Sequence, residues 1–510
     1  MKKGGRWPIW VICLLGSLYV LTRIGSLSVL PMFLDEAVHI QWAERLFEEG
    51  RILRPVAAGR LLAVASYGLA LPFDDRLLAA RAIAAAVGAA TLGFTVLLST
   101  RLFGSRAGVV AGFLYILSPF ALVYDRLALS DGFLSASITG LMFSMWRLTH
   151  HPADRSARVM VVALTVLSVV SKVSAVLYFV SLPLAFLVLE AGGRAAFRSM
   201  AQTLAIGLFF ASPMLWFFVL NGGEITAQHV VDPSALSLQL FSTLSDMCEW
   251  ALRYFTAPAL LFALVSVALL RDGRSSWLAG TVVIPFLLFA FFSKPWSARY
   301  VLPTLPPLLI LISGGLEALA AQVKSSARTP LVLGLSMMVA FPGLFFVREL
   351  VFDPSRAPFP SDDRHQLVSG WPAGYGVREL SIRLLQEADA GPLTAFVDTG
   401  GTRTIATSLP ILLRKAPSLL LVEGDFGSPA FRARMALAAT SARVFAILGP
   451  RSSDLELMSV LEGAKVFRVA VFERPGGEWA ATLFRLVAAP SPAPGPESSD
   501  IPSEGATSSF

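Results

Sequence analysis

Long apolar segments recur along the first two thirds of this chain and end near Val347. An α-helix needs about 20 apolar residues to cross the roughly 30 Å of hydrocarbon in a bilayer. Hydrophobic residues make up 55% of the chain and charged residues only 15%, whereas a soluble domain carries more charge. We therefore expect an α-helical polytopic membrane protein with about 11 transmembrane helices, at roughly residues 8–30, 79–102, 106–123, 132–149, 157–171, 173–189, 201–220, 256–271, 276–292, 300–318 and 329–347.

Charge is distributed unevenly over the loops between these segments. If the first span is retained and the N-terminus is cytoplasmic, alternate loops collect basic residues on the inner side, as the positive-inside rule requires. These residues are Lys2, Lys3, Arg6, Arg101, Arg106, Arg147, Arg155, Arg158, Arg194, Arg198, Arg271, Arg274, Lys324 and Arg328. Acidic residues collect in the outer loops, of which two are long, at 31–78 and 221–255. The pattern predicts a multi-pass protein of the cell (inner or plasma) membrane, and it explains the basic excess without nucleic-acid binding.

The chain beyond the last apolar segment has an ordinary mixed composition. An odd number of spans places it outside the cytoplasm, after a transmembrane domain at 1–347. Strand-like segments fall at 394–398, 418–422, 443–448, 466–472 and 480–487, with helical stretches between the first four and a hairpin turn at 475–478. We therefore expect an extracytoplasmic α/β domain at 348–489, followed by a disordered tail at 490–510 that is rich in Pro, Ser and Gly.

An acidic pair, Asp35 and Glu36, follows directly on the first apolar segment. Carboxylates beside a bilayer are costly unless they are paired or functional. Apolar residues recur at helical spacing over 38–46, and Gly50 is a stop signal. The pattern predicts an amphipathic helix in the membrane interface, with Asp35 at or near its N-cap.

Further ionisable residues lie at the outer ends of the expected spans: Asp125, Arg126, Asp131, Lys172 and Arg299. Lys172 divides an apolar stretch into two short spans, which is an expensive position for a lone ammonium group. Acids and bases at this depth suit an amphiphilic ligand with an anionic head and a lipid tail. Structural alternatives remain, since Lys172 could snorkel to the headgroups and Arg299 could be an interface anchor.

The acidic residues have structural alternatives as well. Asp35 and Asp131 could simply cap the helices that follow them. Asp125 and Arg126 could form a surface ion pair that contributes little.

A series of short motifs runs in order through the apolar region. It comprises Asp35-Glu36 after the first span, Ala-Ala-Arg81 at the second, Leu-Phe-Gly104 and Ser118-Pro119 around the third, then Arg126, Asp131, Lys172 and Arg299-Tyr300-Val-Leu-Pro303. The series resembles the GT-C superfamily of lipid-phosphate-sugar glycosyltransferases over about residues 1–347. Within it, the likeness is greatest to the bacterial glycosyltransferase family 39, which is related to protein O-mannosyltransferases and aminoarabinose transferases.

This resemblance implies an active site on the extracytoplasmic side and a sugar donor carried on polyprenyl phosphate. The acid after the first span acts on the acceptor in such enzymes, so that role carries over to Asp35, with Glu36 beside it and Asp131 as the later acid. Basic residues are expected near the donor phosphate, and the matching candidates are Arg299, Lys172 and Arg126.

The chemistry of such a transfer assigns roles to these side chains. The sugar leaves phosphate through an oxocarbenium-like transition state, and Arg299 and Lys172 could neutralise the charge that grows on the phosphate. Asp35 could accept the proton of an acceptor hydroxyl or amine on a protein, a lipid or a glycan. A single displacement predicts inversion at the anomeric carbon. The sequence indicates no certain cofactor, and a divalent ion between Asp35 and Asp131 is possible because carboxylates and phosphate are hard ligands.

Two other classes of protein compete with this interpretation. A transporter or flippase of lipid-linked sugars would also have many spans, but it should show internal repeats or broken helices at mid-membrane. A receptor would use the outer domain for binding and the spans as an anchor. The stretch 361–376, with its glycines and aromatic residues, could be a lid over the site or a linker turn.

Overall fold

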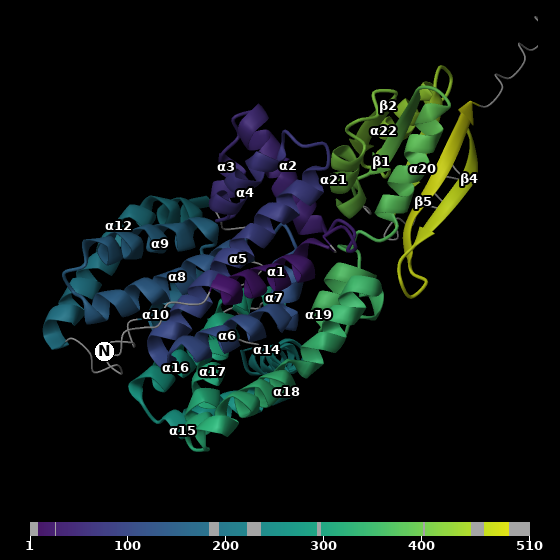
Figure 1. Ribbon diagram of the computed structural model, residues 1–510. Helices are drawn as coiled ribbons and strands as arrows, with labels where there is room; N and C mark the ends of the chain where they lie inside the picture. The colour runs from purple at the N-terminus through teal and green to yellow at the C-terminus, as the bar shows by residue number, and fades with distance from the viewer. Residues whose placement is uncertain are drawn as a thin grey trace, which may run out of the picture.

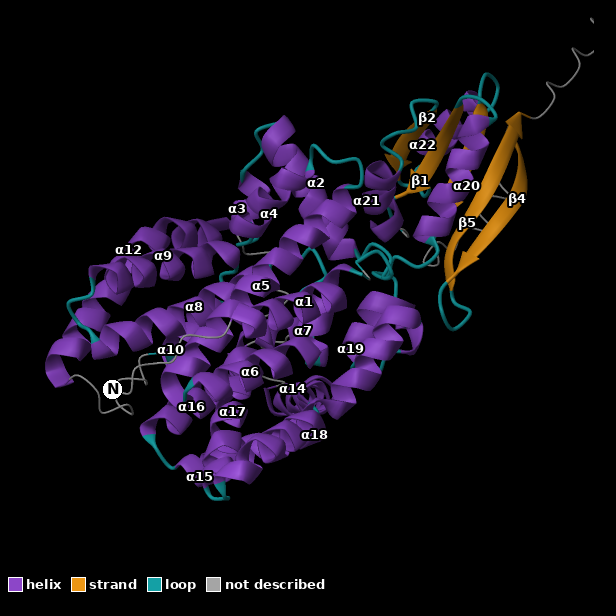
Figure 2. Cartoon of the chain, viewed as in Figure 1, coloured by secondary structure: helices purple, strands orange, loops and turns teal. Residues whose placement is uncertain are grey.

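The protein consists of a long helical body and a smaller part that contains a β-sheet (Figure 1, Figure 2). The computed structural model describes residues 9–25, 27–182, 193–221, 236–292, 297–400, 403–449 and 464–488. The helices of the body are α1 (Ile9–Ile24), α2 (Leu34–Glu48), α3 (Leu53–Ala57), α4 (Leu61–Tyr67), η1 (Gly68–Ala70), α5 (Arg76–Phe103), α6 (Ser105–Leu117), α7 (Pro119–Tyr124), α8 (Asp131–His150), α9 (Arg155–Ser171), α10 (Ala175–Ser181), α12 (Gly193–Asn221), α14 (Leu236–Trp250), η3 (Ala251–Phe255), α15 (Ala257–Leu270), α16 (Gly273–Phe292), η4 (Ala298–Thr304), α17 (Leu305–Ala321) and α18 (Ser325–Phe352).

Five helical segments of the described chain are long and apolar enough to cross a membrane: α5, α12, α16, η4 with α17, and α18. A sixth candidate is bent by 95° where α14 and η3 meet α15, at Thr256. The predicted span at 256–271 is therefore the second arm of this bent pair. Every predicted span coincides with a helix at least in part, although the last residues of the predicted span 173–189 lie outside the described chain. The protein is thus mostly helical with several candidate membrane spans.

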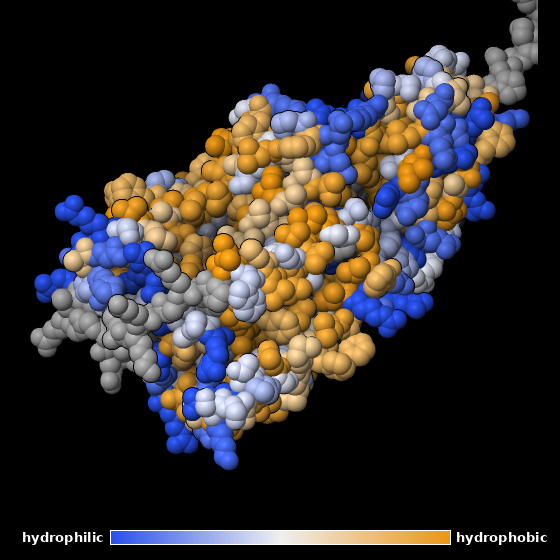
Figure 3. Space-filling view, viewed as in Figure 1, coloured by the Kyte–Doolittle hydropathy of each residue, from blue (hydrophilic) through white to orange (hydrophobic). Residues whose placement is uncertain are grey.

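On the face shown in Figure 3, apolar surface covers much of the middle of the helical body, and hydrophilic residues gather toward its ends and over parts of the sheet. Such a surface is what a bilayer requires, because lipid tails provide no hydrogen-bond partners for polar groups. The helical unit formed by η4 and α17 lies inside the body, because 78% of its most apolar stretch is buried. This burial gives the residues of η4 a rigid support.

Several of the loops with basic residues meet at one end of the helical body. Arg274 donates to the carbonyl of Leu102 (2.7 Å), and Arg106 pairs with Glu317 (3.0 Å). Glu317 belongs to the last turns of α17, whereas Arg299 lies before its first turn. A helix of this length spans about 25 Å, so Arg299 lies at the opposite end of the body from these loops.

The C-terminal part contains a five-stranded sheet in the order β2-β1-β3-β5-β4. Its strands are β1 (Leu393–Asp398), β2 (Leu419–Gly424), β3 (Arg443–Leu448), β4 (Ala464–Glu473) and β5 (Trp479–Ala488), and its helices are α20 (Val377–Asp389), α21 (Arg403–Leu412) and α22 (Pro429–Ala438). β1 pairs in parallel with β2 and β3, and the β4–β5 hairpin joins β3 in antiparallel fashion. All five predicted strands, the hairpin turn and the first two helical stretches are confirmed. The predicted helix between β3 and β4 falls on 450–463, and the predicted disordered tail falls on 490–510. Both lie outside the described residues.

Helix α2 confirms the helix that the sequence predicts after the first apolar segment. Phe33 is its N-cap, and the carboxylate of Glu36 accepts a hydrogen bond from the Phe33 N–H (3.0 Å), as in a capping box. Asp35 therefore lies in the first turn, two residues beyond the N-cap, and does not cap the helix. The helix ends before Gly50, which has a positive φ of 68° that favours glycine.

Candidate active site

Asp35 and Arg299 form an ion pair at the end of the body that carries residues 31–78, the first of the predicted outer loops. Nη2 of Arg299 donates a hydrogen bond to Oδ2 of Asp35 (2.6 Å), and the side chains of Asp35 and Arg299 are 23% and 9% exposed, respectively. Residues that the sequence assigns to the acceptor and to the donor phosphate thus come together, although they are 264 positions apart. Helix α2 supplies the carboxylate, and η4 supplies the guanidinium group.

Arg60 and His39 extend this pair. Arg60 Nη1 lies 4.0 Å from Asp35 Oδ2 and 3.2 Å from His39 Nε2. Because arginine can only donate, Nε2 of His39 accepts, and its Nδ1 carries the proton that is donated to the Ala128 carbonyl (2.9 Å). His39 is therefore a neutral imidazole. Sequence reasoning did not select either residue, although His39 lies one helical turn after Asp35 and Arg60 lies in the same outer loop.

The pKa values of Asp35 and His39 follow from these neighbours. Burial alone would raise the pKa of the Asp35 carboxyl, but Arg299 and then Arg60 outweigh it and hold that pKa below its usual range. For His39, burial and the positive charge of Arg60 lower the pKa to about 4. Near neutral pH the site therefore contains a carboxylate, two guanidinium groups and an uncharged imidazole.

Asp131 and Lys172 form a second buried ion pair, with Nζ to Oδ1 at 2.5 Å. Asp131 begins α8, and Lys172 follows the last residue of α9, where the sequence predicts a break between two short helices. The Lys172 ammonium lies over the ring of Tyr300, 3.8 Å from its centroid. Since Tyr300 follows Arg299 in η4, this second pair lies beside the first.

Glu36 is fully buried and has a different environment from Asp35. Its carboxylate accepts two hydrogen bonds from Arg81 (2.8 and 2.6 Å), one from the Ala128 N–H (2.9 Å) and one from the Phe33 N–H (3.0 Å). A carboxylate has about four lone-pair positions, so all of them are occupied by protein donors. The remaining protons of Arg81 bind carbonyls of the segment before α2, those of Leu27, Leu30 and Pro31. This arrangement leaves Glu36 no oxygen position for a substrate.

Arg126 and its neighbour Asp125 are buried, so the alternative of a surface ion pair is wrong. Asp125 pairs with Arg23 of α1 (3.3 Å) and accepts hydrogen bonds from Tyr19 and Tyr115 (3.3 and 3.1 Å). Arg126 donates from Nε to the Leu122 carbonyl (2.9 Å).

The carboxylates of the site have cationic partners. Asp35 faces Arg299 and Arg60, and Asp131 faces Lys172, so a divalent ion between the two acids would have to displace these cations. No group of three or more His, Cys, Asp or Glu side chains in the described ranges is arranged to hold a metal ion. As arranged here, the two carboxylates are paired with cationic side chains, so their donor set does not fit a metal ion.

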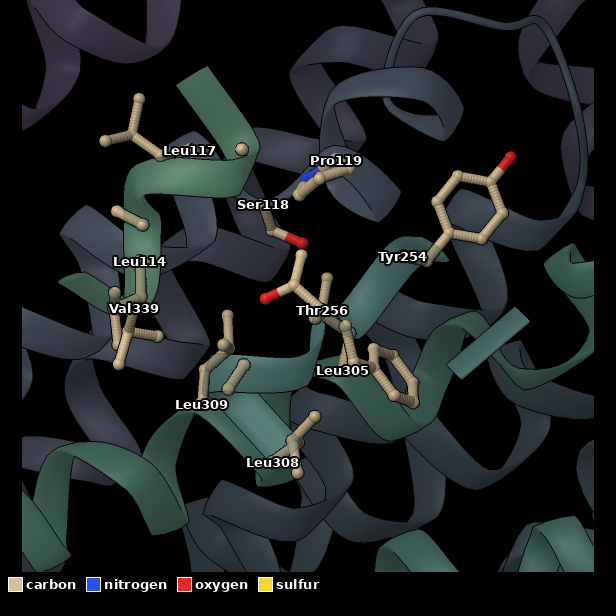
Figure 4. A pocket seen from close by; sticks show the side chains of 14 residues that line it. Leu114, Leu117, Ser118, Pro119, Tyr254, Thr256, Leu305, Leu308, Leu309 and Val339 are labelled. Atoms are coloured by element: carbon tan, nitrogen blue, oxygen red, sulfur yellow. The ribbon is translucent and has the colours of Figure 1, made fainter. Parts of the chain in front are cut away.

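A separate pocket lies between α6, η3, α15, α17 and α18 (Figure 4). Its walls are mostly apolar side chains, with leucine the commonest, and the hydroxyl groups of Ser118 and Thr256 point into it. The residues that line it include none of the candidate site residues. The ionic site and the apolar pocket are therefore distinct features of the body.

Comparisons with solved structures identify the fold. No protein-family model and no curated protein matches the sequence. ArnT from Cupriavidus metallidurans, solved with undecaprenyl phosphate, is similar with a TM-score of 0.61 and 15% identity, over 94% of this chain and 97% of that chain. The Archaeoglobus fulgidus oligosaccharyltransferase, solved with Zn and sulfate, gives a TM-score of 0.53 and 11% identity, over 91% of this chain and 72% of that chain.

A further structure of the Archaeoglobus protein, AglB with an inhibitory peptide and a dolichol-phosphate, gives a TM-score of 0.52 and 11% identity, over 93% of this chain and 74% of that chain. The likeness to these proteins runs through both the helical body and the C-terminal part, because it covers more than nine tenths of the chain. The chain therefore shares the fold of ArnT and of the Archaeoglobus oligosaccharyltransferase, in agreement with the fold that the motifs in its sequence predict.

Proposed function

We propose that this protein is a membrane glycosyltransferase that moves a sugar from polyprenyl phosphate to an acceptor hydroxyl or amine, on the extracytoplasmic side and with inversion. The observation that carries the proposal is the Asp35–Arg299 pair, which brings the predicted proton acceptor into contact with the predicted ligand of the donor phosphate. Solved proteins of this fold bind undecaprenyl phosphate and dolichol-phosphate, which supports a lipid-phosphate donor.

Arg299 has hydrogen-bonding capacity left for a phosphate. Its Nη2 binds Asp35, whereas its buried Nε has no hydrogen-bond partner within the described part of the protein. Guanidinium groups match phosphate oxygens in geometry as well as in charge. Arg60, beside Asp35, and Lys172, over the ring of Tyr300, would add positive charge, and Arg126 is a further candidate that the sequence suggests.

Binding of the donor would change the basicity of Asp35. Arg299 is the largest of the charges that lower the pKa of the Asp35 carboxyl. When Arg299 turns to the donor phosphate, that pKa moves back toward its ordinary value, and the carboxylate becomes a better proton acceptor. The base is then strongest when the donor is in place.

The transfer is a single displacement. The acceptor oxygen or nitrogen forms a bond to the anomeric carbon as the bond from that carbon to the phosphate oxygen breaks, and the electron pair leaves with the phosphate. Asp35 takes the acceptor proton, which is worth about 10²–10⁴ in rate, and Arg299 and Lys172 stabilise the charge on the leaving phosphate. Attack from the face opposite the phosphate inverts the anomeric centre.

The acceptor is a protein, a lipid or a glycan that reaches the extracytoplasmic face. We keep the alternative of a transporter of lipid-linked sugars as the second candidate, but the fold of the similar proteins favours the transferase. A transporter would return both lipid and sugar intact, whereas a transferase releases free polyprenyl phosphate.

The test uses purified protein in detergent with labelled polyprenyl-phosphate sugars and an envelope fraction as acceptor. We expect Asp35→Asn to lose at least about a hundredfold in turnover while it still binds undecaprenyl phosphate. Arg299→Ala should weaken that binding. Asp74→Asn and Arg51→Ala, which alter exposed residues of the same outer loop, are the matched controls. Full turnover by Asp35→Asn, or donor affinity that is unchanged in Arg299→Ala, would contradict the assigned roles.

A further inference from the structure

One stretch of the chain contacts the residues next to Asp35 and also the residues next to Arg299. We call residues 361–376, which follow α18 and precede α20, the connecting segment. It begins with α19 (Ser361–Arg364) and the π-helical turn η6 (His365–Ser369). The sequence left its role open between a lid and a linker.

Asp363 anchors the connecting segment on the side of Arg299. It is fully buried, and its carboxylate accepts hydrogen bonds from the hydroxyl groups of Ser297 (2.6 Å), Tyr254 (2.5 Å) and Tyr124. Ser297 is the N-cap of η4, and Arg299 is the second residue of that helix. Asp363 thus joins three elements of the helical body and holds the backbone from which Arg299 extends.

Pro372 and Gly374 contact the chain on the side of Asp35. The carbonyl of Pro372 accepts a hydrogen bond from the N–H of Leu34 (3.1 Å), which is the residue before Asp35. Gly374 lies so close to the backbone of Met32 that a β-carbon would overlap the Met32 carbonyl oxygen. Only glycine permits this approach, so the segment fixes the start of α2 as well.

The connecting segment is also tied to the C-terminal part. The carbonyl of Trp371 accepts a hydrogen bond from Thr404 of α21 (2.7 Å), and Gly376 packs against Ala480 of β5. Helix α21 in turn receives Gln41 of α2, whose Nε2 donates to the Thr407 carbonyl (3.0 Å). The connecting segment is therefore held near its start by Asp363, farther along by Trp371 and Pro372, and at its end by Gly376.

We propose that the connecting segment is a clamp that positions Asp35 against Arg299, with Asp363 and Pro372 as its two points of attachment. Its effect on turnover rests on the function proposed above, whereas its effect on local structure does not. Misplacement of a reacting group by about 1 Å can cost on the order of 10² in rate, so a clamp of this kind matters for catalysis without touching the substrate.

The experiment follows amide hydrogen exchange by mass spectrometry on the full-length protein in detergent, without donor. Asp363→Ala leaves three buried hydroxyl groups without their acceptor, and we expect amides of η4 and the amide of Leu34 to exchange about tenfold faster or more. Asp363→Asn should restore most of the protection, because hydroxyl groups can accept from the amide NH₂ as well as donate to its oxygen. Asp362→Ala is the matched control, since Asp362 is the neighbouring acid and only half-buried. It should exchange like the wild type.

Two further variants keep the test valid if Asp363→Ala does not fold. Ser297→Ala should speed exchange in η4 only, and Gly374→Ala should speed exchange at Leu34 only. Turnover of the folded variants should fall about ten- to a hundredfold with little change in the affinity for undecaprenyl phosphate. Wild-type exchange in all three variants would overturn the clamp. Altered exchange in a protein that never releases polyprenyl phosphate would instead overturn the proposed function and leave the clamp standing.

Discussion

A substitution of Glu36 tests whether the two adjacent carboxylates, Asp35 and Glu36, have different roles. The sequence assigns both carboxylates to the reaction, whereas in the structure all four acceptor positions of Glu36 are used by protein donors. In Glu36→Gln the amide oxygen can serve only two of these donors, and the NH₂ group faces the others. Each buried donor left unpaired costs about 1–3 kcal/mol, and breaking a buried ion pair typically costs about 3–5 kcal/mol. We therefore expect Glu36→Gln to lower the free energy of unfolding by about 3–5 kcal/mol.

The assay for this prediction is thermal unfolding in detergent, with the yield of monodisperse protein as a second measure. Glu49→Gln is the matched control, because Glu49 at the end of α2 forms only an exposed pair with Arg51 and should change stability by less than about 1 kcal/mol. Since stabilities of about 5–15 kcal/mol are typical, the loss in Glu36→Gln should be unmistakable. A Glu36→Gln protein that unfolds like the wild type but has lost turnover would refute this reasoning and return Glu36 to the catalytic residues.

Two other perturbations test the electrostatics of the site. The pKa of His39 is lowered to about 4 in the folded protein, against about 6.5 in the unfolded chain, so its contribution to stability is present above pH 6.5 and is lost as the pH falls toward 4, by at most about 3 kcal/mol. The unfolding free energy of His39→Gln should lack this pH dependence. A variant with the same pH profile as the wild type would refute the neutral imidazole. Chelation with EDTA should leave turnover unchanged, because Asp35 and Asp131 face cations, and restoration of lost activity by a divalent ion would show that a metal does bind there.

The pattern of apolar segments, loop charges and turn residues was enough to predict most of the architecture. Residues 394–398 and 443–448 alternate or run apolar in the way that buried strands do, and Pro475 to Glu478 can form little other than a turn. The break at Lys172 was equally visible, because a lone charge interrupts an apolar stretch. These are local properties, and neighbouring residues decide them.

The number of spans was less accessible to such reasoning. The apolar segment that begins at 256 has the composition of an independent span, but in the structure it is one arm of a pair bent at Thr256. Composition over about 20 residues measures whether a helix can lie in a bilayer. It does not determine the angle at which that helix meets the preceding one.

The sequence by itself determined which elements form and which ionisable residues lie beside the membrane. Only the tertiary structure decided the partners of those residues: Arg299 for Asp35, Arg81 for Glu36, and three hydroxyl groups for Asp363. The physical reason is that a buried charge needs a partner of suitable geometry, and packing can bring that partner from hundreds of residues away. Two adjacent carboxylates with the same local sequence can therefore have different environments, one partly open beside a cation and one enclosed by donors.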